Sequence, residues 1–148
     1  MEATKRRVGF ALKGISVEQF AYSEKDADKQ VQLGVAFDFR LNTAERLAGV
    51  FIQVNLLHKD SNVLKLVCGC HYEISPESWN TLVNNKKSKV VFPRGFVVHL
   101  AMITTGTARG ILYAKTEKTP YASFVLPMLD AESLFKKDIV FNNAGVKS

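Results

Sequence analysis

Apolar and polar side chains alternate over long stretches in the first half of the chain. The clearest stretch is residues 31–41, in which every second residue is apolar: Val31, Leu33, Val35, Phe37, Phe39 and Leu41. Residues 47–57 and 63–74 repeat this period of two, and residues 8–22 form another apolar stretch with an expected bend at Gly14. A period of two is that of a strand with one buried face. Because the connections are short, we predict a four-stranded antiparallel sheet.

The spacing of apolar residues changes after residue 74. Ser75 and Pro76 are typical of a helix N-cap and first turn, and Ile74 and Trp79 stand where a hydrophobic staple forms. A short helix to residue 83 and a polar loop at 84–89 should follow. A long helix is then expected from Pro93 to residue 115, with an apolar stripe at spacings of three and four: Phe96, Leu100, Ile103, Thr107, Ile111 and Ala114.

The segment after the long helix follows neither period. Residues 116–128, which we call the arm, contain Pro120 and Pro127 between apolar residues. Asp130 can cap a short last helix.

These patterns predict an α+β fold in a single domain over residues 1–148. A four-stranded antiparallel sheet packs against a long C-terminal helix, with an apolar crossover arm and a short last helix. Residues 1–7 and 138–148 are expected to be frayed tails.

Composition and the N-terminal residues predict the cellular location of the protein. Apolar residues make up 47% of the 148 residues and no stretch of 18 is apolar, so we expect no membrane span. The short charged N-terminus does not resemble a secretion signal. Cys68 and Cys70 lie too close along one strand for a disulfide, which favours a reducing cytoplasm.

The formal net charge is +6, which permits contact with nucleic acid or an anionic surface. The basic residues are spread along the chain and do not interleave with aromatic residues on one strand face. Nucleic-acid binding is therefore the least favoured of the functional hypotheses.

Four local motifs carry a resemblance to a known family. The stretch TPYASFVLPMLDAESLF at residues 119–135 has a proline and an aromatic residue, alternating apolar residues, a second proline, then Asp-Ala and Leu-Phe in the last helix. Ala108-Arg109, the strand at 63–74 and Lys13-Gly14-Ile15-Ser16 supply the others. Together these motifs resemble the SecB family of export chaperones, over residues 8–135. The segment at 92–106 departs from the family's usual residues.

The resemblance implies a chaperone that binds unfolded polypeptides without ATP and catalyses no reaction. A protein that holds many clients needs exposed, adaptable apolar surface. The expected client-binding residues lie mainly in the arm and last helix: Tyr113, Tyr121, Phe124, Val125, Leu126, Met128, Leu134 and Phe135.

The family assembles as a dimer of dimers, so the resemblance also implies a homotetramer. The expected interface residues are Val63, Val67, Gly106, Arg109 and Gly110. Well-known family members are acidic and use that acidity to dock the SecA motor. The charge of +6 leaves SecA a possible partner that the electrostatics disfavour.

Each of these assignments has an alternative. The arm residues, taken alone, favour plain core that covers the sheet, and only the resemblance places a client groove slightly ahead. The apolar face of residues 63–74 is either core under the long helix or an oligomer face. Arg109 is interpreted as structural, capping a loop or pairing between subunits. The alternative function is a dedicated interaction protein for one native partner, such as a secretion component or a toxin–antitoxin pair.

Metal and catalytic sites have little support. In Cys68-Gly69-Cys70-His71, His71 should point to the opposite strand face from both cysteines, and zinc prefers four convergent ligands. His99 on an apolar helix is interpreted as a core histidine, and the glycines near Arg109 match no phosphate-binding motif. We therefore expect no metal, no cofactor and no enzymatic activity.

Overall fold

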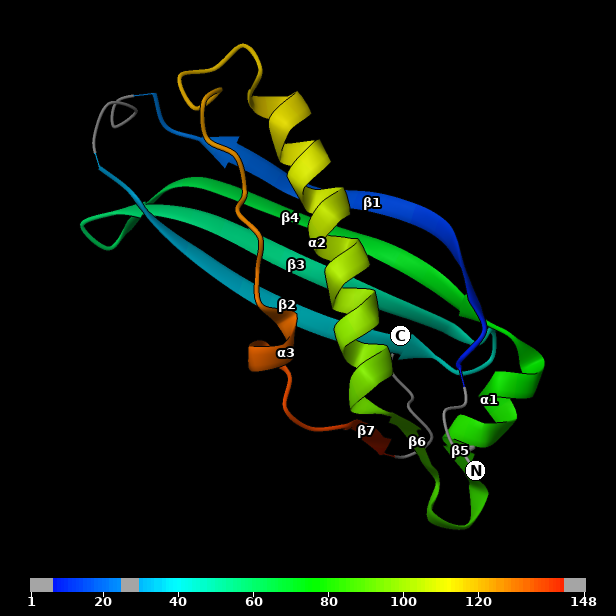
Figure 1. The fold of residues 1–148 in the computed structure, drawn as a ribbon. Helices are drawn as coiled ribbons and strands as arrows, with labels where there is room; N and C mark the ends of the chain where they lie inside the picture. The colour runs from blue at the N-terminus through cyan, green and yellow to red at the C-terminus, as the bar shows by residue number, and fades with distance from the viewer. Residues whose placement is uncertain (1–6, 25–29, 143–148) are drawn as a thin grey trace.

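The main sheet has four long antiparallel strands (Figure 1). The computed structural model describes residues 7–24 and 30–142. The strands are β1 (Phe10–Tyr22), β2 (Gln32–Asn42), β3 (Leu47–His58) and β4 (Ser61–Ile74). They lie in the order β1-β4-β3-β2, so β1 and β2 form the two edges. The predicted sheet is confirmed.

One long helix, α2 (Arg94–Thr116), crosses one face of this sheet, which we call the inner face (Figure 1). The six residues of β4 predicted to share an apolar face are all buried, at 1% exposed or less: Leu64, Leu66, Cys68, Cys70, Tyr72 and Ile74. Their partners on β3 are also buried, since directly paired residues point to the same face. The core therefore lies between the inner face and α2.

The edge strand β1 departs from regular pairing with β4. Its register shifts between Leu12 and Gly14 and again between Val17 and Gln19. The first shift falls at the predicted bend, because each bulge inserts an extra residue that bends the strand. By contrast, β2 pairs with β3 in one unbroken register.

The connection from β4 to α2 is more ordered than the sequence indicated. Helix α1 (Pro76–Leu82) begins as predicted, with the Ser75 side chain accepting a hydrogen bond from the Ser78 N–H. The expected loop contains β5 (Val83–Asn84), the 3-10 turn η1 (Asn85–Lys87) and β6 (Lys89–Phe92).

The prediction of a frayed tail over residues 138–148 is wrong for residues 139–142, and residues 143–148 lie outside the described part of the chain. Residues Ile139–Asn142 form β7, which pairs antiparallel with β6 in a small sheet of order β5-β6-β7. Ile139 and Phe141 pack on the main core, and the Phe141 ring lies 5.0 Å from the Phe92 ring. These apolar contacts stabilise β7. Its four residues are too few to show the alternation of apolar and polar residues from which a strand is predicted.

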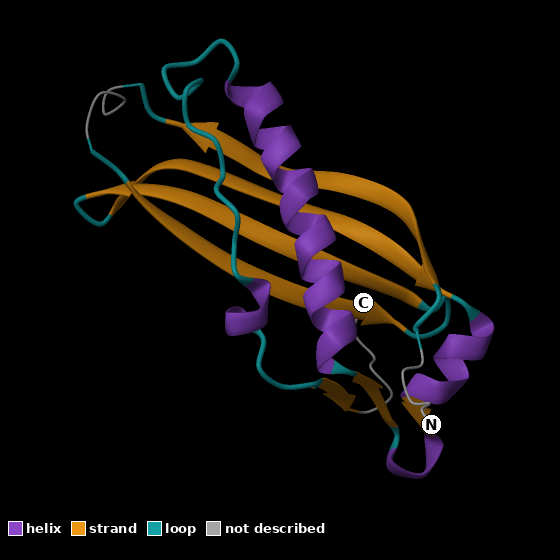
Figure 2. Ribbon diagram, in the orientation of Figure 1, coloured by secondary structure: helices purple, strands orange, loops and turns teal. Residues whose placement is uncertain are grey.

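The arm runs alongside α2 as an extended loop to the one-turn helix α3 (Ala131–Leu134) (Figure 2). Helix α2 is long and apolar enough to cross a membrane by length and composition, but half of its most apolar window is buried inside the protein. It is packed as a core helix of this fold.

Candidate functional site

The arm is attached to α2 through its own backbone. The Arg109 guanidinium donates from Nε to the Leu126 carbonyl at 2.6 Å and from Nη2 to the Pro127 carbonyl at 3.0 Å. Tyr121 donates from its hydroxyl to the Ser23 carbonyl, at the end of β1, at 2.7 Å. Arg109 thus caps a loop within one chain, one of the two structural roles considered for it.

Arm residues alternate between the core and solvent. Tyr121 and Leu126 are 5% and 1% exposed and belong to the core under α2. Phe124 is half-buried against the same core. For these residues, which were predicted to bind clients, the structure favours the alternative in which the arm covers the sheet.

The outward residues of the arm form exposed apolar surface. Val125 is 53% exposed and Met128 is 83% exposed. Leu134 on α3 and Tyr113 on α2 are 54% and 57% exposed. These four predicted client-binding residues are accessible in the folded chain.

One residue of this surface was missed from the sequence. Met102 is 55% exposed and precedes Arg109 by seven residues, so both lie on the same side of α2. Because Arg109 points toward the arm, Met102 and Tyr113 border it. We call Met102, Tyr113, Val125, Met128 and Leu134 the arm surface. The sequence signal for Met102 is its spacing of seven residues from Arg109, which places both on one side of the helix.

A second arginine, Arg94, secures α3, the helix that follows the arm. Arg94 donates from Nε to the Phe135 carbonyl at 2.7 Å and from Nη2 to the Glu132 carbonyl at 2.6 Å. Asp130 caps α3 by accepting from Ser133, and this hydrogen bonding lowers the pKa of the Asp130 carboxyl.

The ring of Phe135 is turned inward. It lies 5.2 Å from Phe37 and 5.7 Å from Phe39, both edge-to-face, so it is half-buried over β2. Phe135 thus joins α3 to the sheet and contributes little to the arm surface.

The residues predicted to form an oligomer interface are scattered. Val63, expected at a subunit interface, is 2% exposed and packs within the core. The register of β3 and β4 shifts beside it: Leu56 pairs with Leu64, but Leu57 pairs with Asn62. Val63 is therefore the extra residue of a bulge, and the bulge turns its side chain toward the core. Val67 is half-buried, and Gly106 and Gly110 are exposed on α2.

Exposed apolar side chains on β1 were not anticipated. Leu12, Ile15 and Val17 are 44%, 53% and 43% exposed. They pair with Tyr72, Cys70 and Cys68 and so point to the inner face, beyond the cover of α2.

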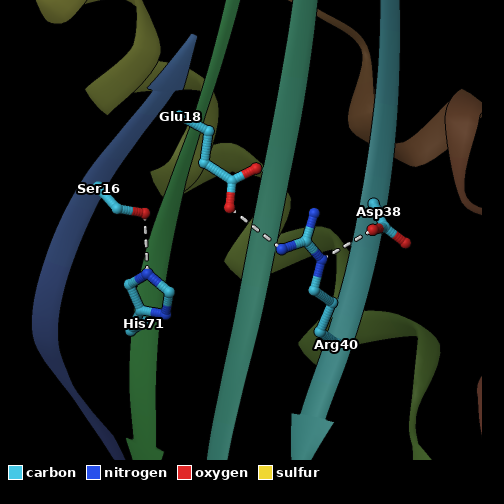
Figure 3. A network of polar contacts seen from close by, with 5 residues as sticks. All are labelled: Ser16, Glu18, Asp38, Arg40 and His71. Atoms are coloured by element: carbon cyan, nitrogen blue, oxygen red, sulfur yellow. Dashed lines mark hydrogen bonds and ion pairs between the residues drawn. The ribbon is translucent and has the colours of Figure 1, made fainter. Parts of the chain in front are cut away.

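The outer face of the sheet carries a polar network (Figure 3). Arg40 on β2 donates to Asp38 at 3.0 Å and to Glu18 on β1 at 3.2 Å. Because β1 and β2 are opposite edges, this contact spans the whole sheet. Ser16 and His71 share a hydrogen bond of 3.0 Å beside it (Figure 3).

The network covers one aromatic ring. The Arg40 guanidinium lies 3.7 Å from the centroid of the Phe51 ring, which is only 5% exposed. A Cβ at Gly69 would lie 2.5 Å from this ring, so the glycine provides the room in which the ring lies flat. Arg40 thus buries Phe51 within one chain.

The cysteine motif is divided between the two faces. Cys68 and Cys70 are buried on the inner face as free thiols, while His71 contacts Ser16 on the outer face. Burial, together with the charge of Cys70, raises the pKa of the Cys68 thiol to about 11. The cysteines and His71 therefore lie on opposite faces of the sheet, as the alternation of side chains along a strand predicted.

Comparison with known proteins places the fold. No family model and no curated protein matches the sequence. A SecB-like chaperone of Mycobacterium tuberculosis, solved in complex with a ChAD peptide from the HigA1 antitoxin, matches with a TM-score of 0.52. The match covers 82% of this chain and 88% of the other, at 9% identity. The chain has a SecB-like fold.

A protein of unknown function from Streptococcus agalactiae matches less well, with a TM-score of 0.41 and 14% identity over 84% of this chain and 99% of that one. In the SecB-like fold described here, the sheet, long helix, arm and last helix follow the predicted order. The small sheet β5-β6-β7 was not part of that prediction.

Proposed function

We propose that this chain is a holdase, which binds unfolded polypeptides without ATP on the arm surface and performs no catalysis. The observation that carries the proposal is a set of exposed apolar side chains on the arm, on α3 and on the neighbouring side of α2. Arg109 holds the backbone of the arm, and Arg94 holds the backbone of α3 and Phe135. Exposed apolar surface of adaptable shape is what weak binding of many sequences requires. A fixed backbone lowers the entropy lost on binding.

The SecB-like fold supports this proposal, since the matched Mycobacterium tuberculosis chaperone was solved with a peptide bound. The buried free thiols fit a reducing cytoplasm, where we propose that the chain acts.

The test is an aggregation assay without ATP. A denatured model protein is diluted into buffer with rising amounts of this chain, and light scattering is followed. We expect suppression near stoichiometric ratios. The double variant Val125→Ser and Met128→Ser should lose most of this suppression while its thermal stability stays close to wild type, because both side chains are exposed.

Val140→Ser is the matched control. Val140 is 45% exposed, similar to Val125, but lies on β7. Its suppression should equal wild type. If wild-type chain at large excess leaves scattering unchanged, the holdase proposal fails. The alternative would then be a dedicated partner, as the antitoxin peptide in the matched structure illustrates, and a specific pull-down would identify it.

We also propose that the chain assembles with copies of itself, as a dimer of dimers. The exposed row Leu12, Ile15 and Val17 on the edge strand β1 supports this, since long apolar edges rarely stay uncovered. Ile15→Lys should shift the molecular mass in sedimentation toward the monomer. An unchanged mass would remove β1 from the interface.

A further inference from the structure

A cavity of about 720 Å³ lies at the start of α2, away from the arm. One wall is the segment that leads into β1, and the other is the first two turns of the helix. Its lining residues are Arg7, Val8, Gly9, Phe10, Pro93, Gly95, Phe96 and His99. This volume is within the usual range of about 300–1,000 Å³ for ligand sites.

The floor of the cavity is aromatic. The ring of Phe10 lies 5.7 Å from Phe96 and 5.5 Å from His99. Phe10 also packs edge-to-face on the buried Tyr72, at 5.6 Å. These contacts fix the rings in place, so the floor offers a preformed surface for apolar or aromatic side chains.

The wall is fixed as well. The Gly9 N–H donates to the Ser78 hydroxyl at 2.8 Å, and the Gly9 carbonyl accepts from the Ser75 N–H at 2.9 Å. The strand entry is therefore bound to the start of α1 and does not depend on a ligand to hold it.

The rim has one sign of charge. Arg7 is exposed and positively charged. His99, interpreted from the sequence as a core histidine, is exposed instead and offers a ring N–H or nitrogen. None of the described residues that line the cavity carries a carboxylate. Helix α2 also presents its N-terminal end here, where the helix dipole favours negative charge.

We propose that this cavity binds an acidic segment of a partner polypeptide, one with an aromatic or large apolar side chain next to Asp or Glu. The apolar side chain lies on the Phe10 and Phe96 rings, and the carboxylate pairs with Arg7. The cavity faces β1, whereas the arm surface lies beside α3 on the other side of α2. The proposal therefore does not depend on the arm.

Gly95 allows the cavity to be filled without strain. A Cβ at Gly95 meets no atom within 4 Å, so Gly95→Leu adds a side chain into open space. Gly110 on the same helix has equally open surroundings but does not line the cavity. Gly110→Leu is thus a matched control for the gain in helix propensity.

The test uses three dye-labelled octapeptides with the same Phe-Leu core, flanked by Asp, Asn or Lys, and measures their Kd by fluorescence anisotropy at low salt. We expect the Asp peptide to bind about tenfold more tightly than the Lys peptide, the effect of one partly screened ion pair. Gly95→Leu should weaken the Asp peptide at least about tenfold, since it occupies the space of the side chain. Gly110→Leu should bind like wild type, and Arg7→Glu should abolish the preference for Asp.

Three results would overturn the proposal. Equal Kd values for the Asp and Lys peptides remove its charge argument. Wild-type affinity in Gly95→Leu, with circular dichroism showing an unchanged fold, removes the cavity. Loss of binding in the Val125→Ser and Met128→Ser double variant, with binding kept in Gly95→Leu, assigns the peptide to the arm surface and leaves the holdase proposal standing.

Discussion

Arg109 holds backbone that forms no strand. Its two hydrogen bonds to the Leu126 and Pro127 carbonyls are among the contacts that fix the C-terminal part of the arm. We predict that Arg109→Met, which keeps the length but not the donors, lowers the free energy of unfolding by about 1–3 kcal/mol. Amide hydrogen exchange in residues 123–128 should accelerate more than elsewhere. Arg109→Lys should fall between the two, and unchanged exchange in the arm would contradict the role assigned to Arg109.

The packing of the Phe51 ring on the outer face depends on the absence of a Cβ atom at Gly69. Alanine is normally better than glycine in a strand, but a Cβ here would lie 2.5 Å from the Phe51 ring. We predict that Gly69→Ala destabilises the protein by about 1–3 kcal/mol, because the ring must leave its place under Arg40. Gly14→Ala on the same face is the control, since its nearest atom is 3.9 Å away. Urea unfolding would measure both, and a stabilised Gly69→Ala would show that the ring moves freely.

At the scale of elements, β7 contributes a short strand with two anchoring side chains. A chain ending at Asn142 should melt like the full chain, whereas one ending at Asp138 loses Ile139 and Phe141 from the core. Because both are partly buried, we predict a loss of about 2–4 kcal/mol in the free energy of unfolding. Equal stability of the two truncated chains would mean that neither the pairing of β7 with β6 nor its anchoring side chains add to stability.

Elements with a long pattern could be predicted, and short ones could not. Six apolar residues at a period of two predicted β2, and Ser75 before Pro76 predicted the start of α1. β6 and β7 have four residues each and pair across an intervening helix and arm, so no local signal links them. The arm was located from its prolines and its resemblance. Which arm side chains point outward depends on the contacts of Arg109 and Tyr121, which the sequence does not specify.

At the scale of the whole molecule, the buried ionisable groups limit stability in alkali. Burial raises the pKa of Cys68 from 9.0 to about 11, and burial also raises the pKa of Tyr72. The unfolded chain therefore releases these protons at lower pH than the folded chain does, which favours unfolding. We predict that the contribution of Cys68 is fully present below pH 9 and is lost as pH rises toward about 11.

Urea unfolding at a series of pH values would measure this dependence, with Cys68→Ala as the comparison. The variant should lose part of the decline above pH 9, since one of the two groups is removed. A parallel decline in both proteins would assign the alkaline sensitivity to other groups.

The way in which the arm and α3 are attached also bears on how their sequence can change. Arg94 and Arg109 bind carbonyl oxygens, which every amino acid possesses. Under the holdase proposal, substitution at Val125 or Met128 would alter what the arm surface binds without altering how the backbone is held. The proposal thus implies that peptide binding and attachment can evolve separately, and a library randomised at these two positions should yield folded members with different peptide preferences.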